Sequence, residues 1–515
     1  MNKRNSGDVS SDDNQLELCP DNDTLGIECQ VTRRQVLQGI GLSTLGASLS
    51  FLGLVDNAQS QVLNPAVPAY APLSLPSQSV KGLIDPTIRK YWNWGRSRNT
   101  TPAVYVEPIL YSDVQEIVKD IEQFPSPVHP VGSMLSVTDT FKNDAGTLVC
   151  LRKLDEVIGI ETLASGLQAV RVQAGCRLKK LHQWLQLRNV EIPFQTEIGE
   201  ATVGSVAVGD TKDSSIDGPG YFSAHVLEVT YVDDSGHLCV LNEQKDSARF
   251  FAFKSSYGLL GIVLECLVEI RPATLCRSSV SIVKFDSPRA LAEAMIERRQ
   301  KGDALLVNIK LDQLVAVFDE RYRAGKGNQT PERSQPASEE SRRARRLSIQ
   351  YGGVGVVVPT PKDLVYSRVD FVNEYWRPEE GENCLDFQYY EHDLGNLMRV
   401  LIESYQFTMD FQKQTDFTPN GWACYFINRG EKLRKPFGLY SGGPGVSFSF
   451  DPFTSNPMEP HWQEFAKKYN RLAIDRLGAG VSPIQTQWLS RGDLRIPKAQ
   501  SKMRFTTSYY HQFLV

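Results

Sequence analysis

Short apolar runs typical of strands alternate with single amphipathic helices along this chain, and the alternation starts afresh near Ser279. Before that point, strand-like runs at residues 104–106 and 128–131 flank a helix, for which Ser112 and Gln115 form a capping-box pattern. After it, a strand is followed by a helix that Ser287 and Pro288 are suited to begin. The sequence therefore predicts an α+β fold, in which a second unit of sheet and helices follows the first.

Composition suggests where the segments begin and end. A chain of 515 residues is long enough for two or three cores. We expect the following segments: an N-terminal extension with a signal at 1–60, a Pro- and Ser-rich linker at 61–100, a first domain at 101–275, a second at 276–440 with a mobile polar loop at 325–348, and a C-terminal segment at 441–515 that packs back on the first domain.

The leader carries a pair of arginines, Arg33 and Arg34, ahead of an uncharged Gly- and Ser-rich run at residues 39–55. This arrangement is typical of a twin-arginine export signal and predicts a periplasmic or otherwise extracytoplasmic protein. The run is short for a membrane span. Because the arginines follow an acidic extension, an uncleaved signal that anchors the protein to the membrane stays open.

Charge and histidine content argue against two classes of protein. The formal net charge is -4, whereas a protein built around nucleic acid usually needs a basic face. A cluster of four arginines between residues 342 and 346 lies in the polar loop and is interpreted as a solvated charge run. The 7 histidines are scattered without zinc-ligand spacing, so we expect no metal centre.

Three segments rich in small residues are candidates for a ligand site. Residues 130–136 form a Gly- and Ser-containing turn straight after a strand, suited to direct backbone N–H groups at a diphosphate. Residues 197–209 are dense in small side chains, which let a flat ligand approach the backbone. Residues 255–263 place two glycines at the start of a strand. Each alone is compatible with simple packing, but their order on an α+β background indicates more.

Residues 101–273 resemble the FAD-binding domain of the vanillyl-alcohol oxidase and p-cresol methylhydroxylase superfamily, in particular its sugar-lactone and alditol oxidases. The runs at 147–155, 172–175 and 257–263 match this family in order and spacing. The resemblance implies a two-subdomain FAD-binding domain of the p-cresol methylhydroxylase type, followed by an α/β cap domain with an antiparallel sheet. Arg504 and Tyr509 lie in a stretch that resembles the family's closing segment.

The resemblance also implies which residues contact FAD. The first segment would hold the diphosphate, the second would line the flavin ring, and the third would contact the nucleotide end. The implied residues are Val131, Gly132, Ser133, Met134, Leu135, Ser136, Glu197, Gly199, Thr202, Gly204, Ser205, Gly261, Ile262 and Val263.

Two departures from the family pattern matter. Many members carry a histidine, covalently joined to the flavin, where this chain has Leu135. We therefore predict non-covalent FAD. Where many members have a Gly-Thr-His-Gly sequence, this chain has residues 210–213, which bring Lys212 to a position that would face the ring.

The function implied is that of an FAD-dependent oxidase or dehydrogenase, which oxidises an alcohol or a sugar lactone by hydride transfer to the flavin. The expected partners are a small-molecule substrate and oxygen or another electron acceptor, with no nucleic acid and with membrane contact only through an uncleaved signal. Alternatives are a flavin-binding protein with little turnover and an exported enzyme that oxidises lipids or sterols. Candidates for the catalytic base, by position only, are Tyr425, Asn428 and Lys212, with Asp386 and Tyr389 behind them.

Overall fold

The computed structural model describes residues 84–85, 89–194, 198–209, 211–212, 218–324, 364–367, 386–429 and 445–515. Residues 80–515 make up one compact unit. The predicted leader, most of the linker, the polar loop at 325–348 and the candidate Glu197 lie outside the described residues.

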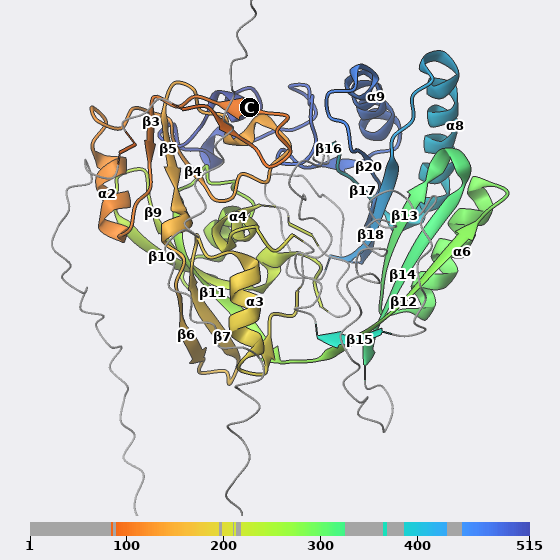
Figure 1. Cartoon of the computed structure of the whole chain (residues 1–515). Helices are drawn as coiled ribbons and strands as arrows, with labels where there is room; N and C mark the ends of the chain where they lie inside the picture. Colours follow the sequence, from red (N-terminus) through yellow and green to blue (C-terminus); the bar gives the residue numbers. More distant parts are fainter. Residues whose placement is uncertain are drawn as a thin grey trace, which may run out of the picture. The chain divides into compact units, whose positions relative to one another are not determined.

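The first layer is a small parallel sheet, in which β5 lies between β3 and β4 (Figure 1). Helix α2 connects β3 to β4, as two parallel strands of one sheet require. Its start differs from the capping-box prediction, because Asp113 supplies the cap in place of Ser112. The Asp113 carboxylate accepts hydrogen bonds from the Leu110 and Ile109 amides at 2.8 and 2.9 Å. The elements are β3 (Val104–Val106), α2 (Tyr111–Lys119), β4 (Val128–Val131) and β5 (Thr147–Cys150).

The second layer is an antiparallel sheet of six strands in the order β10-β9-β11-β7-β6, with β8 paired to β11. The sequence of residues 233–236 (Asp-Asp-Ser-Gly) is typical of a hairpin turn and forms the turn between β9 and β10, where Asp233 accepts from the Ser235 amide and Gly236 has φ +77°. The elements are β6 (Val157–Thr162), β7 (Gln168–Gln173), α3 (Leu178–Gln186), β8 (Val190–Glu191), α4 (Val203–Val208), β9 (Val226–Val232), β10 (Leu238–Asn242), α5 (Ser247–Phe253) and β11 (Ile262–Pro272).

The third layer is a larger sheet, antiparallel throughout, with helices α6 and α8 side by side against it (Figure 1). The predicted start of α6 is confirmed, because the Ser287 hydroxyl accepts from the Ala290 amide at 3.1 Å. The elements are β12 (Leu275–Lys284), α6 (Pro288–Lys301), β13 (Ala304–Lys310), β14 (Val315–Ala324), β15 (Leu364–Ser367), β16 (Asp386–Phe387), β17 (Tyr390–Asp393), α8 (Leu397–Thr415), β18 (Gly421–Asn428), β19 (Val446–Ser449), β20 (Asp451–Thr454), α9 (Pro460–Asn470) and β21 (Gly480–Val481).

The sequence of residues 385–390 is typical of a single strand, but its described part is split between β16 and β17. Between the two, the Gln388 side chain accepts from the Gln487 amide, and the Tyr389 carbonyl accepts from the Thr486 hydroxyl. The C-terminal segment therefore hydrogen-bonds to polar groups of Gln388 and Tyr389, which lie between the two strands. Sequence periodicity carries no sign of this distant segment.

The chain end contacts both cores. Arg504 donates to the Val118 and Ile117 carbonyls of α2 at 3.0 and 2.9 Å, and Phe505 packs into the core of the first two sheets. Tyr510 packs into the core of the third sheet. Within the described residues, none of the helices is long and apolar enough to cross a membrane.

Candidate functional site

A cavity of about 260 Å³ lies where the three sheets and the C-terminal segment come together. Its walls are formed by residues from stretches far apart in the sequence, which lie within 129–136, 198–209, 211–212, 257–263, 423–425, 451–453 and 484–485. All three small-residue segments thus reach one cavity.

The first segment lines the cavity from Val131 to Ser136. Among the described residues, the backbone N–H groups of residues 132–136 have no acceptor within the protein, and the buried Ser133 hydroxyl has no partner. Unsatisfied buried donors are costly unless a ligand pairs with them. Several such donors in one turn suit an anionic group such as a diphosphate.

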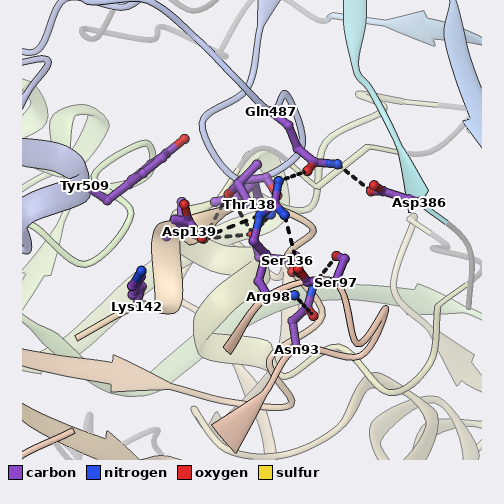
Figure 2. A network of polar contacts seen from close by, with 12 residues as sticks. Asn93, Ser97, Arg98, Ser136, Thr138, Asp139, Lys142, Asp386, Gln487 and Tyr509 are labelled. Atoms are coloured by element: carbon purple, nitrogen blue, oxygen red, sulfur yellow. Dashed lines mark hydrogen bonds and ion pairs between the residues drawn. The ribbon is translucent and has the colours of Figure 1, made fainter. Parts of the chain in front are cut away.

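Contacts outside the segment hold the turn in place (Figure 2). Ser136 donates to the Ile484 carbonyl at 2.6 Å, and the Asn93 amide donates to the Ser136 carbonyl at 2.9 Å. Arg98 donates to Gln487, whose side chain in turn donates to Asp386 of β16. The sequence does not indicate these anchoring residues, because no local pattern links residues that are 43 to 389 positions apart.

The second segment packs directly against the first. A Cβ atom on Gly132 would lie 2.1 Å from Thr202 Oγ1, and one on Gly204 would lie 2.8 Å from the Ala174 Cβ. Thr202, Gly204 and Ser205 line the cavity. Gly199 does not line the cavity. Its carbonyl accepts from the Lys179 amide of α3.

The third segment reaches the cavity through Gly261 and Val263. Ile262 does not line it, because successive side chains of β11 point to opposite faces and Ile262 is buried in the core. Gly261 has φ +156°, and a Cβ there would lie 2.6 Å from the Tyr231 ring. Only glycine fits at this position.

Lys212 and Asp451 form an ion pair on the cavity wall, with side chains 8% and 6% exposed. Lys212 follows the second segment, whereas Asp451 begins β20 of the third sheet. Burial lowers the pKa of Lys212 and raises that of Asp451, and their mutual attraction opposes both shifts. The Lys212 Nζ also lies 3.7 and 5.0 Å from the ring centres of Tyr389 and Tyr425.

The other candidates for the catalytic base differ in whether their side chains line the cavity. Tyr425 lines the cavity, but Asn428 does not, since it lies three residues further along β18 and faces the other side. Tyr389 donates its hydroxyl to Glu391 at 2.5 Å, and Asp386 accepts from the Trp462 ring N–H at 2.9 Å. Neither of these two side chains lines the cavity.

His129, at the end of the cavity near the first segment, is 5% exposed. Its Nδ1 atom has no partner among the described residues. Burial lowers the pKa of His129 to about 4, so the ring is neutral at ordinary pH.

Residues 102–242 match the family model described as an FAD-binding domain. This match covers the first two segments, the parallel sheet and the strands β9 and β10. The match agrees with the FAD-binding domain expected for this stretch.

Curated relatives agree with this FAD-binding domain. The chain is 28% identical over 198 residues to the D-arabinono-1,4-lactone oxidase of Eremothecium gossypii, which covers 38% of this chain and 36% of that protein. It is 25% identical over 183 residues to the L-gulonolactone oxidase of Bos taurus, which covers 36% of this chain and 40% of that protein. The chain thus spans little more than a third of the length of the relatives it matches.

The likeness in fold to solved structures extends over much more of the chain than these sequence matches do. A cholesterol oxidase from Brevibacterium sterolicum superposes with a TM-score of 0.58 over 83% of this chain and 90% of its own, at 12% identity. A solvent-stable cholesterol oxidase gives a TM-score of 0.60 over 79% of this chain and 87% of its own, at 14% identity. These likenesses show a shared fold, which includes the antiparallel sheet predicted for the second unit.

The residues at the cavity fit FAD. The free donors of the first segment suit its diphosphate. Gly132 leaves room for the Thr202 side chain and Gly204 for Ala174, so these stretches pack closely at the cavity. The partnerless Ser133 hydroxyl and His129 Nδ1 are further polar groups for the cofactor to satisfy.

Proposed function

We propose that the chain is an FAD-dependent oxidoreductase, which oxidises an alcohol or sugar-lactone substrate by taking a hydride from a CH–OH carbon. The proposal is carried by the continuity of the cavity. It runs from the turn suited to the diphosphate to a buried ion pair and Tyr425 at the third sheet. A cofactor site and a polar substrate site thus share one space, as hydride transfer requires.

The chain's own residues have separate tasks in this reaction. The N–H groups of residues 132–136 would hold the diphosphate, and Thr202 and Gly204 would leave room for the ring. When bound, FAD supplies the acceptor for the hydride. The apolar side chains of Phe387 and Phe453 line the same wall as Asp451 and exclude water from the reacting atoms.

The test is a panel of sugar lactones, alditols and sterols mixed anaerobically with the purified, FAD-loaded protein. We expect at least one lactone or alditol to remove the absorbance of the oxidised flavin, and turnover to resume with oxygen or an artificial acceptor. Bleaching by sterols alone would identify the lipid-oxidising alternative. Oxidised flavin throughout would support a flavin-binding protein with little turnover.

The cofactor is expected to dissociate. Leu135 lines the cavity at the place where related chains carry their linking histidine, and it has no nucleophilic nitrogen. After acid precipitation, the yellow colour should therefore stay in the supernatant, and the pellet should show no flavin fluorescence on a denaturing gel. A fluorescent band that disappears in His129→Ala would contradict the prediction and identify His129 as the attachment site. Leu135→His serves as the positive control and should create such a band.

For the leader, which lies outside the described residues, the proposal is export to the periplasm by the twin-arginine route. The paired arginines ahead of a weakly apolar run support it, and this route carries folded proteins, which suits a cofactor inserted in the cytoplasm. Replacing Arg33 and Arg34 with lysine should leave the protein in the cytoplasm, as fractionation would show. Unchanged export would rule the route out and leave the fold untouched.

A further inference from the structure

Lys212 and Asp451 are a lysine and an aspartate that both lie on the cavity wall. Among the described residues that line it, no other lysine, arginine, aspartate or glutamate occurs. Lys212 follows the second segment and Asp451 begins β20, 239 residues further on, yet the two make a direct charge-assisted hydrogen bond. A buried pair such as this one costs desolvation energy, so it is weak as a device for stability alone.

The remaining contacts of the pair orient the carboxylate. Asp451 Oδ2 also accepts from the Ser449 hydroxyl at 2.8 Å, and Oδ1 accepts from the Tyr390 amide at 3.1 Å. Oδ1 therefore keeps one of its lone pairs for a further donor. Lys212 keeps the carboxylate ionised against burial and holds it against the cavity.

We propose that Asp451 is the base that accepts the substrate hydroxyl proton, and that Lys212 is the positioning residue that keeps it ionised. The inference rests on the proposed function. The C–H bond breaks with its electron pair passing to FAD, the O–H proton passes to Asp451, and a C=O double bond forms. Tyr425 reaches the same cavity, but a phenol would first have to give up its own proton to act as a base, whereas a carboxylate is an acceptor as it stands.

The decisive experiment compares two quantities in the FAD-loaded protein: the two-electron midpoint potential of the flavin and the rate of anaerobic flavin reduction by substrate. Asp451→Asn removes a negative charge from the cavity that would hold the flavin and leaves Lys212 uncompensated, so the potential should rise. A higher potential alone would speed reduction. Loss of the base should instead slow reduction by about 100-fold or more.

Two further variants separate this role from a structural one. Asp451→Glu keeps the base and should recover much of the rate. At a pH high enough to keep Asp451 ionised, Lys212→Met leaves its negative charge uncompensated and should shift the potential in the opposite direction, downward. If the pair had only a structural role, these variants would change neither the midpoint potential nor the rate of flavin reduction.

Asp319→Asn is the matched control, because it removes the same charge from another buried ion pair of the third sheet. Asp319 pairs with Arg321 at 3.0 Å and does not line the cavity. Neither potential nor rate should change. Should Asp451→Asn fail to retain FAD, the comparison of Asp451→Glu and Lys212→Met with wild type still decides.

The failures are distinguishable. Wild-type protein that no substrate reduces would refute the proposed function, and this inference with it. Wild-type protein that is reduced, with Asp451→Asn reduced equally fast, would overturn the inference and leave the proposed function in place.

Discussion

Gly132→Val should yield a protein that purifies with little or no FAD. Any Cβ at this position would lie 2.1 Å from Thr202 Oγ1 and 2.9 Å from Thr202 Cγ2, so the first segment must move away from the second. Such overpacking costs about 1–3 kcal/mol, which corresponds to an affinity about 5- to 150-fold lower if the cost falls on FAD binding.

The measurements are the ratio of flavin to protein absorbance after purification and the FAD dissociation constant from fluorescence quenching. Gly159→Val is the control, because a Cβ on Gly159 in β6 meets nothing within 4 Å. This variant should bind FAD like wild type. Normal FAD binding by Gly132→Val would show that the segment does not hold the cofactor.

Lys212→Met should destabilise the protein by about 3–5 kcal/mol at neutral pH, because it leaves the Asp451 carboxylate buried without its cation. The double variant Lys212→Met with Asp451→Asn removes both charges and should recover most of that loss. Urea unfolding of wild type, the two single variants and the double variant measures the coupling between the residues.

The effect of Lys212→Met should also depend on pH. Burial already raises the pKa of Asp451 in the wild-type protein, and removal of the lysine raises it further. A carboxyl whose pKa is higher in the folded than in the unfolded state stabilises the fold most below the unfolded value, and this contribution is lost as pH rises through the folded value. The stability gap between the single and the double variant should therefore widen from about pH 4 upward. Glu391, which also attracts Lys212, stays in both variants and cancels in the comparison. A gap that does not change with pH would mean that Asp451 is not buried as the structure shows.

The sequence determined those features that depend on near neighbours. Ser287 followed by Pro288 starts α6, and the Asp233 turn joins β9 to β10, because capping and turn chemistry act within a few residues. The resemblance carried by the runs at 147–155 and 172–175 likewise implies the FAD-binding domain. Its match to residues 102–242 confirms that inference.

Tertiary structure alone decided how these pieces meet. Helical and strand periodicity names the residues on one face but not the element that face will contact, so Ile262 and Asn428 were assigned to a cavity from which their strands turn them away. The turn that Ser136 ends is anchored by Ile484, and Lys212 found its partner in Asp451, 239 residues further on. Such pairings follow from the packing of whole sheets against one another. The energy of a buried pair depends on that packing and leaves no periodic or local trace in the chain.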